Sequence, residues 1–332
     1  MKYDLLGEAS VKISAIGMGC WAFAGGAYWG TQEEKDSIDT INAAMHAGIN
    51  FFDTAEMYGD GKSEEVVGKA LQHCRSQVVI ATKAASSNLS HEKLIKACEQ
   101  SLKRLKTDYI DLYQIHWPNR EVPFEETAKA LELLVQQGKV RTVGVCNFGA
   151  LDMESILKAT SIVSNQLPYS LLWRAIEGEI LPQCINKDVG ILCYSPLSQG
   201  LLTGKYKSVE EVPAGIAGTR YYSKERSANA RHGESGLETE TFDAIDKIRK
   251  ICERLGKPMG NIAVAWLLAQ KGIKSVLVGA RTPKQLHENI KAGSIILGDD
   301  VIKALSDATL ELKQKVGNNP DMWEGKQKSR FQ

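Results

Sequence analysis

Short runs of apolar residues recur along the chain and alternate with longer stretches in which apolar positions follow a helical period. Each short run is apolar at nearly every position, which is typical of strands buried on both faces of a parallel sheet. The runs are Ala15–Gly19, Asn50–Asp53, Val78–Lys83, Tyr109–His116, Thr142–Cys146, Ser161–Asn165, Ile191–Ser195 and Ser275–Gly279. Eight strands alternating with helices predict an α/β fold, the (β/α)8 (TIM) barrel, because eight parallel strands close a sheet on itself.

The longer stretches predict helices on the outside of this barrel. The clearest of them are Glu33–His46, Ser63–Leu71, His91–Leu105, Phe124–Gln137 and Phe242–Leu255. Ser63 is the expected N-cap of its helix. Gly48, Gly138 and Gly256 follow helical stretches, so we expect them at C-terminal caps with positive φ.

Further segments extend the alternating pattern at both ends of the chain. Tyr3–Ile13, with a turn at Gly7–Ser10, predicts an N-terminal β-hairpin. Extra helices are expected near the C-terminus at Asn261–Gln270 and Asp300–Leu312, with a polar tail over about residues 313–332. The polar stretch Gly204–Gly236 is too long for a routine connection, and it is either a lid over a ligand or a solvated loop. We expect a single domain over residues 1–332.

Composition excludes several classes of partner. The 332 residues include 41 basic and 40 acidic side chains, a balance that offers no attraction to nucleic acid or to an anionic membrane. No apolar run approaches the roughly 18 residues that a membrane span needs. The seven cysteines are dispersed and the six histidines lack the spacing of metal ligands, so we expect a cytoplasmic protein without disulfides or a metal site.

Two apparent nucleotide-binding motifs lack the structural context they require. Gly17–Ala22 matches the dinucleotide pattern G-x-G-x-x-G/A, but the following residues continue as a loop, whereas that motif must open into a helix. Gly61, Lys62 and Ser63 end like a P-loop, but Glu56 stands where the first glycine of that motif is required. We interpret the first as a glycine-bearing strand end and the second as a turn followed by the N-cap residue Ser63.

Four polar side chains lie at or just beyond the ends of predicted strands. Asp53 ends one strand, Lys83 ends the next, His116 ends a third, and Tyr58 lies five positions after Asp53. The carboxyl ends of barrel strands converge on one face, where the active sites of this fold are built. We therefore expect these side chains to meet.

Together the four residue types fit hydride addition to a carbonyl group, which leaves an alkoxide that must be protonated. A phenol, with a pKa of about 10, is an effective acid near neutral pH if that pKa is lowered. We assign Tyr58 as acid and base, Lys83 as the cation that lowers its pKa, Asp53 as the partner of the lysine, and His116 as the group that orients the carbonyl.

The sequence resembles the aldo-keto reductases, and in particular their branch with general stress reductases and potassium-channel beta subunits. Asp53 and Tyr58 lie in the first of the motifs that carry the resemblance, Lys83 in the second and His116 in the third. The matching segments are Phe51–Gly59, Val79–Lys83, Asp108–Trp117, Gly138–Phe148, Asn165–Gln166 and Tyr194–Tyr206.

The resemblance implies reversible reduction of aldehydes or ketones with NADP(H), used in preference to NAD(H). It places Trp21 and Asp53 beside the nicotinamide, with Asn147 and Gln166 on its carboxamide and Tyr194 stacked on its ring. The pyrophosphate is expected at Ser195, Leu197, Gln199, Gly200 and Leu202. The adenosine end is expected at Gly279, Arg281, Gln285, Glu288 and Asn289.

The sequence departs from the family pattern at two places. Cys146 stands where many relatives have serine, which weakens one hydrogen bond to the carboxamide. Gly279 and Ala280 stand where some branches have lysine and serine, so recognition of a 2′-phosphate is left to Arg281, whose guanidinium suits a phosphate.

Substrate and partners are less defined by the sequence. Trp21, Tyr28, Trp29 and Trp117 are expected to wall an aromatic pocket or to pack the barrel rim, and Trp323 either closes this pocket or sits in a partner subunit. The chain is a monomer or a homo-oligomer. One alternative function is a nucleotide-binding regulatory subunit, and another is a lyase or isomerase that uses Lys83 as a Schiff base.

Overall fold

A closed barrel of parallel strands forms the centre of the molecule. The computed structural model describes residues 1–7 and 11–332, except for the side chains of Ala27 and Tyr28. Within this part, eight parallel strands pair in the order β10-β3-β4-β5-β6-β7-β8-β9. They are β3 (Ile16–Gly19), β4 (Phe51–Asp53), β5 (Val79–Ala84), β6 (Ile110–Ile115), β7 (Val140–Cys146), β8 (Ser164–Pro168), β9 (Gly190–Tyr194) and β10 (Ile273–Gly279). The predicted (β/α)8 barrel is confirmed.

The strand β8 begins three residues later than predicted. Ser164, rather than Ser161, is its first residue, and Pro168 is its last. Proline reads as a strand breaker because it lacks an N–H donor. At the end of β8, however, Pro168 pairs with Tyr194 of β9 and the missing donor is tolerated.

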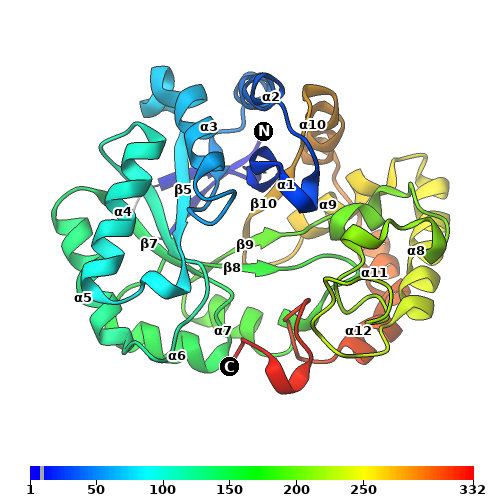
Figure 1. The fold of residues 1–332 in the computed structure, drawn as a ribbon. Coiled ribbons are helices and arrows are strands. Elements are labelled where there is room, and N and C mark those ends of the chain that lie inside the picture. Colours follow the sequence, from blue (N-terminus) through cyan, green and yellow to red (C-terminus); the bar gives the residue numbers. More distant parts are fainter. Residues whose placement is uncertain (8–10) are drawn as a thin grey trace.

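Helices surround the barrel and cover its strands (Figure 1). Their buried positions recur at helical spacing, as Leu94, Cys98 and Leu102 do in α4. The helices are α1 (Gly26–Trp29), α2 (Glu34–His46), α3 (Lys62–Leu71), α4 (His91–Leu105), α5 (Phe124–Gln136), α6 (Ala150–Ala159), α7 (Ile180–Asn186), α8 (Glu238–Leu255), α9 (Met259–Leu268), α10 (Pro283–Ile290), α11 (Asp299–Ala308) and α12 (Leu310–Val316). The helix predicted at Asp300–Leu312 is two helices that meet at Thr309.

The predicted helix caps are correct at the C-termini and wrong at one N-terminus. Gly48, Gly138 and Gly256 have φ values of 84°, 71° and 60°. Ser63, in contrast, does not cap α3, whose N-cap is Gly61 with φ of 90°. Ser63 is buried inside the helix, where its hydroxyl accepts a hydrogen bond from Thr54 and donates one to the Cys20 carbonyl.

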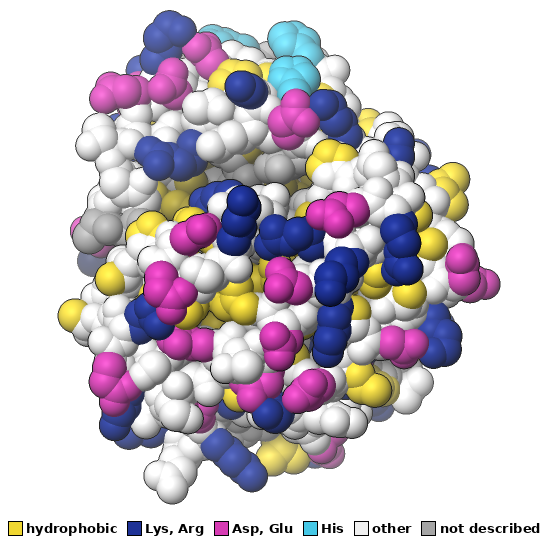
Figure 2. Space-filling model, turned by 90° about the vertical axis from the view of Figure 1, so that its right-hand side faces the viewer, with side chains coloured by type: hydrophobic (Ala, Val, Ile, Leu, Met, Phe, Trp, Pro, Cys, Tyr) yellow, Lys and Arg dark blue, Asp and Glu magenta, His cyan; other side chains and the backbone are white. Residues whose placement is uncertain are grey.

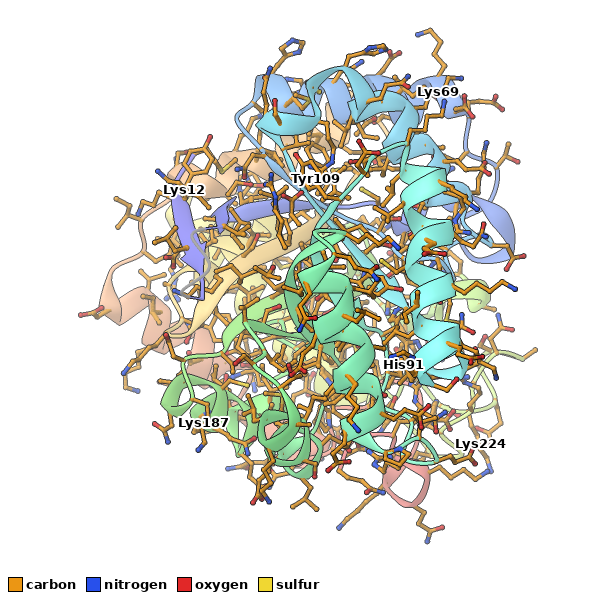
Figure 3. All side chains as sticks on the ribbon, turned by 90° about the vertical axis from the view of Figure 1, so that its left-hand side faces the viewer. Lys12, Lys69, His91, Tyr109, Lys187 and Lys224 are labelled. Carbon is orange, nitrogen blue, oxygen red and sulfur yellow. The ribbon has the colours of Figure 1, made fainter. Side chains whose placement is uncertain are left out.

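An N-terminal hairpin closes one end of the barrel. Its strands β1 (Tyr3–Leu6) and β2 (Val11–Ser14) are antiparallel, and residues 8–10 of the predicted turn lie outside the described residues. Its apolar side chains, Leu6, Val11 and Ile13, belong to a cluster with Phe51, Val79, Ala81, Leu112, Leu192 and Leu277. The hairpin lies on the face shown in Figure 3, where Lys12 marks it.

The segment 204–236 is packed against the C-terminal tail, and the two lie side by side in Figure 1. Arg220 donates hydrogen bonds from its guanidinium to the Asn319 and Asp321 carbonyls at 3.0 and 3.3 Å, and from its backbone to the Met322 carbonyl at 2.8 Å. Tyr221 is fully buried. These contacts are not those of a solvated loop.

Candidate active site

The side chain of Lys83 joins two of the other predicted residues. Its ammonium donates hydrogen bonds to Asp53 Oδ1 at 2.6 Å, to the Thr54 carbonyl at 2.9 Å and to the Tyr58 hydroxyl at 3.3 Å. The side chains of Lys83 and Asp53 are almost completely buried, at 0% and 4% exposure. Asp53 and Lys83 lie on the paired strands β4 and β5, and Tyr58 lies on the loop after β4.

The second carboxylate oxygen of Asp53 accepts hydrogen bonds from two amides. Gln114 and Gln166 donate to Asp53 Oδ2 at 3.1 and 2.8 Å. A buried carboxylate is stable only when its charge is paired and its lone pairs are bonded. Burial lowers the pKa of Lys83, but the neighbouring Asp53 and Tyr58 raise it, and the net pKa lies above the ordinary value. Lys83 is therefore a permanent cation at neutral pH.

The pKa of Tyr58 differs from the sequence expectation. Lys83 lowers the pKa of this phenol as predicted, but the larger effect of burial raises it, and Asp53 raises it further, to about 12. The net direction predicted from the sequence is therefore wrong, because a sequence does not show how strongly a side chain is desolvated. At neutral pH Tyr58 carries its proton and can donate it.

His116 lies against the ring of Tyr58. The two ring centroids are 5.6 Å apart and the rings are nearly perpendicular, at 81°. Burial lowers the pKa of His116 well below its usual value, and the positive charges of Lys83 and Arg330 lower it further. Nδ1 is buried, with no hydrogen-bond partner among the described residues. The imidazole is thus neutral, and a buried polar atom remains for a ligand.

A set of side-chain amides continues from the tetrad along the barrel mouth. The Tyr194 hydroxyl donates to Asn147 Oδ1 at 2.9 Å, and Asn147 Nδ2 lies 3.1 Å from both the His116 carbonyl and the Cys146 sulfur. The Cys146 thiol lies 3.8 Å from Gln166 Oε1. Asn147 has a φ of 63°, a left-handed conformation that is uncommon for residues other than glycine. Such strained backbone positions cluster at binding sites.

The loop after β9 has the same unusual backbone. Ser195, Gln199 and Gly200 have φ values of 53°, 53° and 97°, and Leu202 is buried. The amide oxygen and nitrogen of Gln199 are both buried and have no hydrogen-bond partner among the described residues. Buried amides without partners are costly. The loop, which also contains Leu197, therefore offers donors and acceptors to a bound molecule.

The residues predicted for the adenosine end lie at the end of β10, in the segment that follows it and along α10. The backbone N–H of Arg281 donates to Gln285 Oε1 at 2.8 Å, and Asn289 donates to the Gly279 carbonyl at 3.2 Å. The carboxylate of Glu288 pairs instead with Lys291 at 2.8 Å.

The predicted aromatic wall forms two separate groups. Trp21 stacks on Tyr58 with centroids 5.8 Å apart, and it meets Trp29 edge to face at 5.2 Å. Trp117 contacts the C-terminal tail instead, and Tyr28 has its backbone in α1 and its side chain outside the described part of the chain.

The tail supplies two residues, Arg330 and Phe331, that the sequence analysis did not assign to the site. The Arg330 guanidinium lies 3.6 Å from the centroid of the Trp117 ring, and Phe331 meets the same ring edge to face at 5.5 Å. Trp323 stacks on Tyr194, with centroids 6.3 Å apart and rings 15° from parallel. The one signal in the sequence was the presence of two aromatic residues and an arginine in an otherwise polar tail.

The arrows of β8 and β9 point toward the face of the molecule shown in Figure 2. Lys and Arg side chains gather across the middle of this face, with acidic side chains between them (Figure 2). Within residues 1–7 and 11–332, no group of three or more His, Cys, Asp or Glu side chains is placed to hold a metal ion. In that same part of the chain, no helix has the length and apolar character needed to cross a membrane.

The geometry agrees with comparisons to known proteins. Aldo-keto reductase YhdN of Bacillus subtilis is 38% identical over 301 residues, covering 86% of this chain and 87% of the relative. The NADH-specific methylglyoxal reductase of Escherichia coli is 34% identical over 333 residues, covering 93% and 97%. A solved aldo-keto reductase from Klebsiella pneumoniae in complex with NADPH has a TM-score of 0.71 at 27% identity, covering 90% and 92%. Residues 15–309 match the Aldo/keto reductase family, and the chain belongs to that family.

Proposed function

We propose that the protein reduces aldehydes or ketones to alcohols, reversibly, with NADPH as hydride donor and Tyr58 as general acid. The observation that carries this proposal is the position of the Lys83 ammonium, 2.6 Å from the Asp53 carboxylate and 3.3 Å from the Tyr58 hydroxyl. A buried phenol held beside a permanent cation is suited to give up a proton as negative charge develops on a nearby oxygen.

The residues at the barrel mouth fit a nicotinamide dinucleotide. Asn147 and Gln166 offer amides at the inner end, Gln199 has unpartnered buried amide atoms in the middle, and Arg281 offers a guanidinium at the outer end. A carboxamide, a pyrophosphate and a 2′-phosphate match these groups in that order. One relative is named as NADH-specific and one related structure holds NADPH, so the preference for NADPH rests on Arg281 of this chain.

The geometry of the tetrad supports the roles proposed for its residues. When bound, the reduced nicotinamide supplies the hydride that is added to the carbonyl carbon. Tyr58 donates its hydroxyl proton to the carbonyl oxygen, and the hydride and the proton together give the alcohol. Lys83 stabilises the resulting phenolate, because its ammonium is already within 3.3 Å of the hydroxyl. The neutral His116 imidazole, beside the Tyr58 ring, orients the carbonyl oxygen by a hydrogen bond.

The substrate is proposed to be a small carbonyl compound with an apolar or aromatic group. Trp21 and Trp29 wall the Tyr58 side of the mouth, and Trp117 with Phe331 walls another side. Aromatic rings of this kind bury apolar surface and orient a substrate ring edge to face or offset.

The acid role of Tyr58 is tested by replacing it with phenylalanine. We expect Tyr58→Phe to lower kcat for NADPH-dependent reduction of a panel of aromatic and short-chain aldehydes by about 10²-fold to 10⁴-fold. The dissociation constant of NADPH should change little. The matched control is Tyr109→Phe. Tyr109 lies on the face opposite the barrel mouth, between the guanidinium groups of Arg75 and Arg141 (Figure 3). Equal activity of Tyr58→Phe and wild type would refute the acid role, and no turnover across the panel would refute the proposed function.

A further inference from the structure

The segment between α1 and α2 is hydrogen-bonded to Arg281, which lies between β10 and α10. Arg281 Nε donates a hydrogen bond to Gln32 Oε1 at 2.8 Å, and Gln32 Nε2 donates to the Arg281 carbonyl at 3.1 Å. Arg281 Nη2 also donates to the Thr31 carbonyl. Gln32 and Arg281 are 249 positions apart in the chain, and the hydrogen bonds between them involve both side chains and the Arg281 carbonyl.

The Gln32 side chain is itself fixed. Its Nε2 also donates to the Ser37 hydroxyl of α2 at 3.1 Å. Three residues before Gln32, Trp29 packs edge to face on Trp21. The segment that contacts Arg281 is therefore anchored at both of its ends, by an aromatic contact on one side and by a helix on the other.

The contacts leave one edge of the Arg281 guanidinium available. Nε and Nη2 are bonded, whereas Nη1 has no hydrogen-bond partner among the described residues. The side chain is half-buried at the start of α10, beside Gln285. An arginine fixed in this way presents its remaining N–H groups in a single direction.

We propose that Gln32 is a positioning residue for cofactor choice: it holds the Arg281 guanidinium where it can bind a phosphate on the 2′ position of an adenosine. This inference rests on the proposed function and identifies which residues would make its site prefer a phosphorylated dinucleotide. Gln32 acts through Arg281.

The physical reason is the rotamer freedom of a free arginine. Fixing a long flexible side chain costs conformational entropy, and a site in which folding has already fixed that side chain binds its ligand more tightly. Specificity is a difference between the affinities for two ligands. A residue that acts only on Arg281 therefore changes the affinity for the ligand with a 2′-phosphate and leaves the affinity for the ligand without it unchanged.

The test measures binding without turnover. Dissociation constants of adenosine 2′,5′-bisphosphate and adenosine 5′-monophosphate, and of NADPH and NADH, are measured by calorimetry for wild type, Gln32→Leu, Arg281→Ala and the double variant. The matched control is Gln72→Leu, because Gln72 is an exposed glutamine before β5, at the opposite end of the barrel. We expect Gln32→Leu to weaken the two 2′-phosphorylated ligands about tenfold and the other two by less than about twofold. In the Arg281→Ala background, Gln32→Leu should have no further effect.

Several outcomes would overturn the inference. Tighter NADPH binding by Gln32→Leu would mean that Gln32 withholds Arg281 from the ligand. Equal weakening of all four ligands, or a full effect of Gln32→Leu without Arg281, would indicate a purely structural role. Wild-type protein without preference for the 2′-phosphate would also refute it, while carbonyl reduction with NADH, measured separately, would leave the proposed chemistry intact.

Discussion

Tyr58 shows how two opposite effects act on a single side chain. The sequence places a lysine where it lowers the pKa of the phenol, and the structure brings the two groups to 3.3 Å. Burial acts in the opposite direction and is the larger effect, so the pKa rises to about 12. The identity and position of Tyr58, Lys83, Asp53 and His116 could be predicted from strand ends. The desolvation of the phenol could not, because it depends on aromatic neighbours such as Trp21.

His116 should remain neutral across the physiological pH range. Its pKa is lowered by burial first, then by Lys83 and Arg330, so the folded protein resists protonation where an unfolded chain takes up a proton near pH 6.5. The free energy of unfolding is therefore unaffected by this histidine above about pH 6.5, and it decreases as the pH falls below that value. We expect the ¹⁵N shifts of His116 to stay constant from pH 8 to pH 6. The fall in the free energy of unfolding below pH 6.5 should be shallower in His116→Gln. A His116 titration midpoint near 6.5 would contradict this.

Elements whose ends are determined by the local sequence pattern were predicted best. The α4 helix has its predicted bounds, His91–Leu105, because its apolar stripe is regular. The final helix was predicted as continuous, but Arg174 donates hydrogen bonds to the Ser306 carbonyl and to the Thr309 hydroxyl, where α11 ends. A contact across more than 130 residues sets that helix end, and no local pattern contains it.

Gly68 in α3 shows the same limit and gives a testable case. Helix propensity alone would make Gly68→Ala stabilising by about 1 kcal/mol. A Cβ atom at this position, however, would lie 2.6 Å from the backbone of Arg104 and Leu105, where α4 ends against α3. We expect Gly68→Ala to lower the free energy of unfolding by about 2 kcal/mol in urea denaturation. The control is Gly260→Ala in α9, where the added atom has its nearest neighbour at an ordinary 3.6 Å, and there we expect no loss. Equal stability of the two variants would contradict this account.

At the scale of the whole molecule, the C-terminal tail and the segment 204–236 together form one rim of the barrel mouth. Tail residues contact the segment after β6 at Trp117, α6 at Asp152, and the long segment at Arg220. The sequence left two choices open for the long segment and two for Trp323. The structure favours a packed rim, with Trp323 stacked on Tyr194 of the same chain.

Asp321 organises this rim, and its replacement should loosen it. Asp321 is fully buried and accepts a two-bond ion pair from Arg330 at 2.8 and 2.7 Å, together with the backbone N–H groups of Trp323 and Glu324. Asp321→Asn removes the charge that Arg330 needs. We expect a loss of about 2 kcal/mol of unfolding free energy and faster amide hydrogen exchange over residues 318–332. Asp243→Asn, on the exposed side of α8, is the control. Unchanged exchange in the tail would show that Asp321 does not hold it.

The N-terminal hairpin closes the end of the barrel opposite the mouth, so that face carries none of the proposed site residues. Lys12 is exposed on that hairpin, and Figure 3 shows it on the face opposite the mouth. Its Nζ lies 5.6 Å from the ring of Tyr3, and the Tyr3 hydroxyl donates to the Gly48 carbonyl, so the hairpin is tied to the body of the protein. Immobilisation of the protein on a solid support through Lys12 would therefore leave the mouth facing the solution.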